Sequence, residues 1–392
     1  MSALHLLIGI LAIVLMVPAA VLLVECLGGA LFWSRHQARP LSDRRLRTVV
    51  LIPAHNEESS VGETVSHVLG QLTPGDQVIV VADNCTDKTA EVAQQAGARV
   101  LQRSSPDRGK GYALAFGVES LADSPPDVLV VLDADTRLKD GSVQRLVSEA
   151  AATGRPAQAV YLLQPSANAT LKQRISALAF LTKSLGRAPG AYLLGCPNQL
   201  CGTGMAFPWE VIRAAPLASA NIVEDVKLGI DLTIHGRTPL FCPDAQVIGD
   251  VVPTDADVHG QRCRWEHGHL YTMLTEIPRL LAHAIRRGRI DLLALALDLS
   301  VPPLSLFVLL LALLQVIAIV AGCLMSQWTA AWLNGASIAA VAVAVFLTWL
   351  LHGRSIVPFR VLLGIPLYIA WKIPLYVAFV VKRQTKWNRS AR

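Results

Sequence analysis

Long apolar segments at both ends of the chain limit what it can fold into more than any other feature. A helix that spans a bilayer needs about 20 mostly apolar residues. Residues 4–33, 301–325 and 329–351 each meet that length. The chain is 53% hydrophobic and 16% charged, whereas soluble domains carry about 25% charged residues. Because the deficit lies at the two ends, the sequence predicts a soluble middle flanked by membrane helices.

Charges beside the apolar segments predict an orientation. Basic residues follow the first segment at once: Arg35, Arg39, Arg44, Arg45 and Arg47. Such residues favour the cytoplasmic side, so we expect a multi-pass protein of the plasma (inner) membrane with its middle domain in the cytoplasm. Glu25 is the one acid of the first segment, and Asp298 lies just before the second. We expect Asp298 to occupy a polar position at the membrane interface.

The segment 356–381 is apolar enough to span but contains Arg360, Lys372 and two prolines. If it crossed, the basic tail would lie outside, against the usual charge bias. We therefore expect an interfacial or re-entrant helix and a cytoplasmic tail. The net charge of +6 then indicates contact with anionic lipid headgroups and diphosphates. No nucleic-acid-binding motif is present in the sequence.

The middle of the chain alternates strand-like and helix-like segments. Buried strands are predicted at 48–53, 77–82, 99–102 and 128–132, with helical patterns between them. This alternation predicts an α/β, Rossmann-like, mostly parallel sheet. Acidic residues follow the second and fourth of these strands, and ligands bind at that edge in open α/β sheets. A simple loop or helix cap is the alternative for each acid.

Several short motifs occupy this region in a fixed order. They are Ile52–Glu57 (IPAHNE), Val81–Asp87 (VADNCTD), Arg108–Tyr112 (RGKGY), Asp133–Asp135 (DAD), Leu200–Phe207 (LCGTGMAF), Glu224–Asp225 and Gln261–Trp265 (QRCRW). Together they resemble the membrane-bound inverting glycosyltransferases of family 2, which include cellulose, chitin and hyaluronan synthases and lipid glucosyltransferases. The resemblance covers residues 46–268 and implies a GT-A fold.

The resemblance implies a nucleotide-sugar site in the first half of the domain. The residues concerned are Pro53, Ala54, Glu57, Asp83, Lys110 and Asp133. The acid and glycine that the family usually has beside Asp83 are replaced by Ala82 and Asn84, and Asn also tolerates a left-handed backbone. Asp135, supported by Asp133, matches the metal ligands of the DxD motif. Oxygen ligands suit Mg²⁺ or Mn²⁺ rather than Zn²⁺.

The resemblance places the acceptor in the second half. Asp225 matches the general base, which takes the proton of the attacking hydroxyl; a helix N-cap is the alternative. The other acceptor- or diphosphate-binding residues implied are Gly202, Thr203, Glu224, Gln261, Arg264 and Trp265. In the QxxRW motif the last three lie on one helical face, where an amphipathic interface helix is the alternative. Trp387 partly matches a gating segment of some polysaccharide synthases, and a headgroup anchor is equally compatible.

These observations predict a domain order along the chain. The predicted parts are an anchor at 1–34, a cytoplasmic glycosyltransferase domain at 46–270, interfacial amphipathic helices at 271–298, two membrane helices at 299–351, and an interfacial helix with a basic tail at 352–392.

The predicted activity is transfer of a sugar from a UDP-sugar donor to a glycan or lipid-linked acceptor presented at the membrane. The QxxRW motif favours exopolysaccharide or cell-surface glycan assembly, whereas the small number of membrane segments favours one addition to a lipid or polyprenyl-diphosphate acceptor. Polysaccharide-assembly partners or a second copy of the chain could supply further helices. The alternatives of other classes are a membrane scaffold or transport subunit with a degenerate nucleotide-binding domain, and a nucleotidyltransferase.

Overall fold

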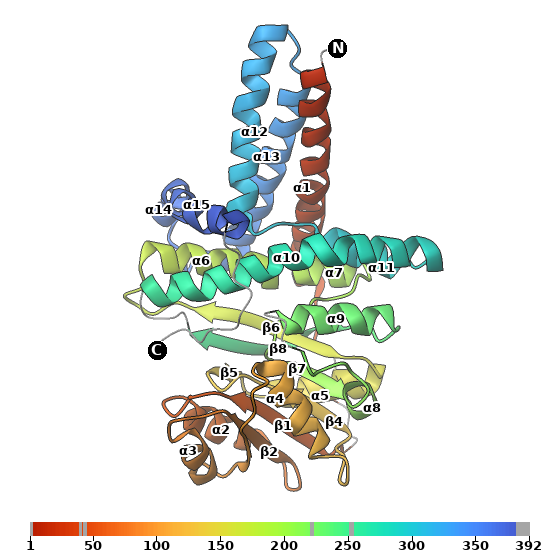
Figure 1. The fold of residues 1–392 in the computed structure, drawn as a ribbon, viewed down its shortest axis with the longest axis vertical. Helices are drawn as coiled ribbons and strands as arrows, with labels where there is room; N and C mark the ends of the chain where they lie inside the picture. The colour runs from red at the N-terminus through yellow and green to blue at the C-terminus, as the bar shows by residue number, and fades with distance from the viewer. Residues whose placement is uncertain (1–2, 39–40, 42–44, 220–222, 251–254, 382–392) are drawn as a thin grey trace. The chain divides into compact units, whose positions relative to one another are not determined.

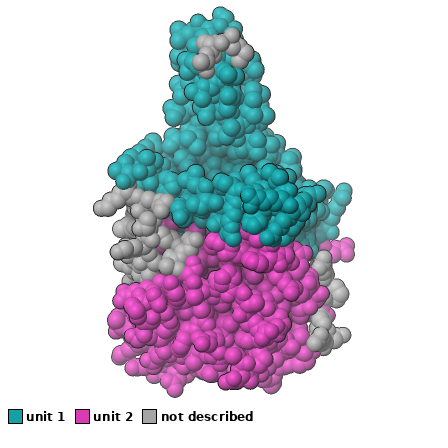
Figure 2. Space-filling model, turned by 45° about the vertical axis from the view of Figure 1, so that its right-hand side comes forward, with its two compact units in different colours: residues 1–36, 167–196, 265–384 teal, residues 37–166, 197–264, 385–392 magenta. Residues whose placement is uncertain are grey.

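A computed structural model describes residues 3–38, 41, 45–219, 223–250 and 255–381, with the backbone alone at 3 and 255–262. The chain forms two compact units (Figures 1 and 2). Unit 1 comprises residues 1–36, 167–196 and 265–384, and unit 2 comprises residues 37–166, 197–264 and 385–392. The predicted domain 46–270 thus includes a stretch, 167–196, that belongs to the unit of the membrane helices.

Unit 2 is built on a sheet that has eight strands within the described residues. The strands are β1 (Thr48–Ala54), β2 (Gln77–Asp83), β3 (Arg99–Arg103), β4 (Val128–Val131), β5 (Thr136–Leu138), β6 (Ala157–Gln164), β7 (Met205–Pro208) and β8 (Leu240–Asp250). Their order is β3-β2-β1-β4-β7-β6-β8-β5. The neighbours β3-β2-β1-β4 are parallel, as are β6 and β8. β7 is antiparallel to β4 and β6, and β5 is antiparallel to β8. The prediction of a mostly parallel α/β sheet is confirmed.

Helices cover both faces of the sheet (Figure 1). In β1 and β2, even-numbered residues pack with α2 (Val61–Leu69), α3 (Thr89–Gln95) and α5 (Ser142–Thr153). Odd-numbered residues of the same strands pack with α4 (Lys110–Glu119), α8 (Trp209–Ile212) and α9 (Glu224–Ile234). Burial on both faces explains why these strands read as continuous β-branched and aliphatic runs instead of alternating patterns.

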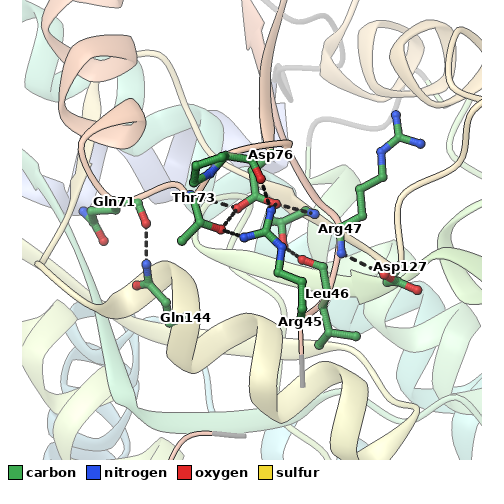
Figure 3. Close-up of polar contacts among 10 residues, drawn as sticks. Arg45, Leu46, Arg47, Gln71, Thr73, Asp76, Asp127 and Gln144 are labelled. Carbon is green, nitrogen blue, oxygen red and sulfur yellow. Dashed lines mark hydrogen bonds and ion pairs between the residues drawn. The ribbon is translucent and has the colours of Figure 1, made fainter. Parts of the chain in front are cut away.

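The start of β1 is fixed by side-chain carboxylates at the edge opposite to the strand ends that carry the motifs. Asp76 accepts hydrogen bonds from the backbone N–H groups of Thr48 and Thr73, both at 3.0 Å. Asp127 accepts one from the N–H of Arg47 at 2.7 Å, and Figure 3 shows this cluster. These bonds satisfy backbone donors that lie before the ladder begins, so they set the register in which β1 enters the sheet.

Unit 1 contains helices that are long and apolar enough to cross a membrane. Three such spans occur in the described part of the chain: Leu4–Arg35, Leu304–Met325 and Thr329–Gly353. They correspond to α1 (Ala3–Arg35), α12 (Leu304–Met325) and α13 (Thr329–Thr348), the last continued by the π-helical turn η2 (Trp349–Gly353). Buried residues of all three helices form shared apolar clusters. Asn334 of α13 donates to the carbonyl of Leu311 in α12 at 2.9 Å, a polar contact of the kind that joins membrane helices.

The remaining helices of unit 1 are shorter or more polar than the three spans. They are α6 (Leu171–Leu181), the π-helical η1 (Thr182–Arg187), α7 (Ala188–Leu193), most of α10 (Asp255–Arg287), α11 (Ile290–Leu299), α14 (Phe359–Leu362) and α15 (Ile365–Val381). Helix α15 corresponds to the segment predicted to be interfacial or re-entrant. Its Lys372 is buried and ion-paired with Glu266 of α10. This pairing accounts for a lysine within an otherwise apolar helix.

Glycines bring α1 into backbone contact with η1 and α7. A Cβ atom at Gly29 would lie 2.0 Å from the carbonyl oxygen of Gly186, and one at Gly190 would lie 1.8 Å from that of Glu25. Gly186 and Gly190 form a Gly-x-x-x-Gly pair of the type that allows close helix approach in membranes. Any larger residue at Gly29 or Gly190 would force the two backbones apart.

The close approach allows Arg187 to join three segments of unit 1. Its guanidinium is 2.6 Å from a carboxylate oxygen of Glu25 in α1 and 2.6 Å from one of Asp298 in α11. All three side chains are largely buried. Asp298 is therefore buried inside the unit, where it is paired with a residue distant in sequence. Its predicted position at the level of the membrane interface stays a prediction. A single guanidinium therefore bridges two carboxylates, one in α1 and one in α11.

Removal of the Arg187 guanidinium should destabilise unit 1 strongly. Breaking a buried ion pair leaves uncompensated charge, at a cost of about 3–5 kcal/mol. We expect Arg187→Met to lower the midpoint of thermal unfolding in detergent well below that of Arg286→Gln, which changes an exposed arginine. Arg187→Lys should recover part of the loss. Equal midpoints for Arg187→Met and the wild type would contradict this assignment.

Candidate active site

The ends of β2 and β3 bring an acidic and a basic side chain together. Asp83 and Arg103 are paired residues in the register of the two strands, and their side chains form an ion pair at 2.6 Å. Asn84 also donates to Asp83, at 3.1 Å. Asp83, predicted to contact the nucleotide base, is thus held at the edge of the sheet that ligands approach. Arg103 was not predicted as part of the site; it directly follows the predicted strand 99–102 and is the last residue of β3.

Two asparagines shape the loops that follow β1 and β2. Asn56 and Asn84 have left-handed backbones, with φ of 57° and 52°. The side-chain oxygen of Asn56 accepts from the N–H of Thr86 at 2.7 Å, and that of Asn84 accepts from the N–H of Ser105 at 3.0 Å. The left-handed backbone predicted to be tolerable at Asn84 is present. The loops are thereby tied to one another beside the last residues of β1, Pro53 and Ala54.

Glu57 has a local structural role in addition to any contact with a ligand. Its carbonyl accepts the N–H groups of Ser60 and Val61, at 3.1 and 2.9 Å, and its carboxylate accepts from the Ser60 hydroxyl at 3.0 Å. Glu57 thus closes the turn that leads into α2. The N-cap of that helix, Ser60, makes no capping hydrogen bond through its side chain.

Lys110 lies at the centre of the site. It begins α4, and its ammonium group pairs with Asp133, which follows β4. It also donates to the carbonyl of Gly202 at 2.7 Å. One side chain therefore joins three predicted motifs: RGKGY, DAD and LCGTGMAF. Gly109 just before it has a φ of 133°, a conformation that L side chains rarely adopt, so glycine is required where the chain turns into α4.

The loop that carries Gly202 and Thr203 is held firmly against the end of β4. The Thr203 hydroxyl accepts from the N–H of Asp133 at 3.1 Å and lies 2.9 Å from the Thr136 hydroxyl. Gln158 of β6 donates to the Thr203 carbonyl at 2.9 Å and accepts from the N–H of Cys201 at 2.8 Å. Thr203 is fully buried. It therefore positions Asp133 through the backbone, rather than presenting its own side chain to a ligand.

Asp225 and Glu224 open α9 on the other side of Gly202. A Cβ atom at Gly202 would lie 3.2 Å from both a carboxylate oxygen of Asp225 and the ammonium nitrogen of Lys110. Gly202 thus separates the predicted base from the lysine, and its φ of 82° also favours glycine. Asp225 accepts from the N–H of Val226 at 2.8 Å within the first helical turn. The N-cap of α9 is Val223, so Asp225 lies inside the first turn and satisfies one of its N–H groups without being the N-cap.

Crowding of acids gives the site an unusual electrostatic balance. Burial raises the pKa of Glu224 to about 8, with Asp225 adding to the effect and Lys110 opposing it. Burial also raises the pKa of Asp133, although Lys110 partly offsets this. The pKa of Lys110 is raised by Asp133, Glu224 and Asp225, against the effect of its burial. At neutral pH the Glu224 side chain therefore keeps its proton, so it can donate a hydrogen bond within the site.

The carboxylates of the site can hold a hard divalent cation only if further ligands complete its coordination. Asp133 and Asp135 supply carboxylate oxygens, the type preferred by Mg²⁺ and Mn²⁺. Within the described residues, no group of three or more His, Cys, Asp or Glu side chains converges on a single metal position. A cation at this pair would thus need phosphate oxygens or water for its remaining ligands.

The QxxRW motif lies in α10, which runs from unit 2 into unit 1. The side chain of Gln261 lies outside the described residues. Arg264 is assigned to unit 2 and Trp265 to unit 1, where its ring is 6.0 Å from that of Phe180. The helical setting predicted for the motif is present, and the roles of the three residues stay predictions. Trp387 also lies outside the described residues.

Comparisons with known proteins agree with this architecture. The model of "Glycosyl transferase family 2" matches residues 49–189, and that of "Glycosyl transferase family group 2" matches residues 128–378. The chain is a glycosyltransferase with flanking membrane-type helices. It belongs to the family 2 glycosyltransferases.

Two known proteins are similar to this chain, one in sequence and one in structure. The 4,4'-diaponeurosporenoate glycosyltransferase of Staphylococcus aureus (strain USA300) is 32% identical over 126 residues, which are 31% of this chain and 33% of that relative. A mannosyltransferase from Pyrobaculum calidifontis, solved in complex with GDP-Man and Mn2+, has a TM-score of 0.55 at 16% identity, and the match covers 96% of this chain and 100% of that chain. The latter likeness confirms the GT-A fold.

The raised pKa of Glu224 predicts a pH-dependent stability of the metal-free protein. The folded state holds this proton up to about pH 8, whereas the unfolded chain releases it near pH 4.5. Stability should therefore fall as pH rises from 4.5 to 8. Since Glu224 keeps some solvent contact, we expect a loss of about 1 kcal/mol. Thermal unfolding in the presence of EDTA, at pH 5.5 and at pH 8, measures this loss in the free energy of unfolding.

Glu224→Gln should flatten that dependence, because glutamine mimics the protonated acid. Asp123→Asn, at an exposed acid of the same unit, should leave the wild-type profile unchanged. If the Glu224→Gln and wild-type profiles coincide, ionisation of Glu224 is not the cause of the trend.

Proposed function

We propose that this protein is an inverting glycosyltransferase that moves a sugar from a UDP-sugar to an acceptor presented at a membrane surface. The observation that carries the proposal is the junction of Lys110, Asp133 and Gly202 with Asp225 immediately beyond Gly202. It supplies a diphosphate-binding cation, a metal-binding pair and a base within one cluster. A scaffold with a degenerate site would have no need to keep these groups in contact.

Inversion requires a base on the face of the sugar opposite the leaving group. Asp225 would take the proton of the acceptor hydroxyl as its oxygen attacks the anomeric carbon and the bond to the diphosphate breaks. Glu224, whose pKa is raised to about 8, would be protonated and would serve as a hydrogen-bond donor. Asp83, Pro53, Ala54 and Glu57 would line the nucleotide pocket at the ends of β1 and β2.

A bound Mg²⁺ or Mn²⁺ would offset the negative charge that develops on the departing diphosphate. Asp135 and Asp133 would hold that cation. Lys110 would hold Asp133 in place and add a positive charge to the same region. Arg264 would contact the diphosphate as a planar cation, while Trp265 and Gln261 would contact the acceptor.

The acceptor would be reached at the membrane face of a cytoplasmic catalytic unit. Basic residues after α1 and the three candidate spans support this orientation. Three spans are few for lining a polymer channel, and the similar Staphylococcus aureus enzyme is named for 4,4'-diaponeurosporenoate, not for a polymer. These two observations favour a single addition to a lipid-linked acceptor over the exopolysaccharide elongation suggested by the QxxRW motif.

Asp225→Asn should remove most of the transferase activity. Loss of a positioned general base lowers rates by about 10²–10⁴-fold, whereas UDP binding should be retained because Asp225 does not contact the nucleotide in this mechanism. The assay is UDP release and product formation by purified protein with a panel of UDP-sugars and GDP-mannose, with Asp123→Asn as the matched surface control. Wild-type rates in Asp225→Asn would rule out this base; conversion of nucleoside triphosphates to pyrophosphate would indicate a nucleotidyltransferase.

Metal and nucleotide should bind cooperatively, because among the described residues the Asp133–Asp135 pair is too small a donor set to complete a metal site. We expect Mn²⁺ alone to bind weakly and to bind at least tenfold more tightly with UDP present, with reciprocal tightening of UDP. Asp135→Asn should abolish this coupling. Isothermal titration of wild type and variant, with EDTA-treated protein, provides the measurement. Metal affinity that is independent of UDP would contradict a site completed by the diphosphate.

A further inference from the structure

A pocket in unit 2 extends from the candidate base along one face of α9. Its cavity volume is about 210 Å³, which is smaller than the roughly 300–1,000 Å³ usual for drug-sized ligands and suits a small group such as one sugar ring. Lys110, Gly202 and Asp225 line one part of it, and Lys227 and Asp231 line another. The walls between them are largely apolar: Leu114, Met205, Pro216, Leu217 and Leu228. The catalytic proposal makes no use of the α9 part of this pocket.

The polar residues of α9 in the pocket follow helical spacing. Glu224, Lys227 and Asp231 are separated by three and four residues, so they lie on the same face of the helix. Lys227 and Asp231 form an ion pair at 2.5 Å. The Asp231 side chain is only 12% exposed, unlike the solvated pairs usual on helix surfaces. A largely buried charged pair that lines the same pocket as the candidate base is suited to ligand recognition.

The charges of the pocket define the kind of group it can hold. Both lysines that line it are already ion-paired, Lys110 with Asp133 and Lys227 with Asp231. A carboxylate or phosphate entering beside Asp225 and Asp231 would meet like charges. Neutral hydroxyl groups would not, and an ion pair offers them both a donor and an acceptor with charge-assisted hydrogen bonds. The apolar walls suit the C–H faces of a sugar ring.

We propose that the Lys227–Asp231 pair recognises hydroxyl groups of an uncharged hexose, and that it is a specificity-determining element of this glycosyltransferase. The hexose is either the sugar of the donor or the terminal sugar of the acceptor; both offer adjacent hydroxyls next to the base. This inference rests on the proposed function, because it takes Asp225 as the group beside the reacting sugar.

The test compares Lys227→Gln and Asp231→Asn with the wild type. The probes are UDP-glucose, UDP-galactose (which differs at one hydroxyl) and methyl β-D-glucoside as a surrogate acceptor. Rates of transfer, and of donor hydrolysis without acceptor, are measured together with UDP affinity. A lost charge-assisted hydrogen bond should lower kcat/KM by about tenfold to a hundredfold, while UDP affinity stays within twofold.

The two sources of the hexose give different results. If the pair holds the donor sugar, the ratio of kcat/KM for UDP-glucose over UDP-galactose changes in both variants, and hydrolysis changes with it. If the pair holds the acceptor, hydrolysis and donor selectivity stay at wild-type values, and KM for the glucoside rises. Either result supports the proposal.

A merely structural ion pair gives a third result, which overturns the proposal: both variants unfold at lower temperature yet keep all wild-type kinetic ratios. The matched control is Glu210→Gln with Arg213→Gln, which removes an exposed pair from α8 and should not alter selectivity. Failure of the proposed function is distinct, because wild type would then neither transfer nor hydrolyse any nucleotide sugar. In that case the binding affinities of UDP-glucose and UDP are measured by titration. If the glucose group raises the affinity by the same factor in the wild type and in Asp231→Asn, the proposal is also overturned.

Discussion

The ammonium group of Lys110 is the contact on which the arrangement of the candidate active site depends. Lys110 is the first residue of α4, yet its side chain reaches the end of β4 and the loop before β7. Without a cation there, the carboxylates of Asp133 and Asp225 would repel each other in a poorly solvated space. The sheet brings these segments near to one another, and Lys110 makes their close approach electrostatically acceptable. It balances only part of the negative charge, which leaves the site suited to a further cation.

A comparable principle operates in unit 1, where buried charges join segments that are apolar in sequence. Arg187 satisfies Glu25 and Asp298, and Lys372 satisfies Glu266. Apolar helices in a lipid-like environment gain little from hydrophobic association with one another. Specific polar pairs and glycine contacts therefore determine which helix faces meet. In both units, a few charged side chains decide how preformed helices and strands are assembled.

The sequence predicted the local structure of the first half of unit 2 well. The four predicted strands end within one residue of β1 to β4, because strands buried on both faces produce clear aliphatic runs. The later strands were not assigned, and the segment read as an acceptor-side loop includes β7. Met205 and its neighbours become a strand by pairing antiparallel with β4. Such pairing depends on partners distant in the chain, and local patterns do not reveal it.

The residues of the candidate site, like the strands, could be predicted only in part. Motifs in family order indicated Lys110, Asp133 and Asp225, which the fold brings together. Arg103, Lys227 and Asp231 carry no motif, and Thr203 proved to be a buried support for Asp133. The burial of Asp298 was not predicted, because its partner, Arg187, lies 111 residues away. Only the folded chain shows which charges neutralise one another, so residue type and spacing alone do not determine burial.

The Glu25–Arg187 pair also has a consequence for how the protein is made. Glu25 emerges from the ribosome 162 residues before its partner. At about 5–20 residues per second, that interval is roughly 8–32 s. During this time the first membrane helix holds an acid whose intended counter-ion does not yet exist. Helix α1 can therefore reach its final packing only after η1 has been synthesised. It completes its contacts late in biogenesis, although it is translated before η1.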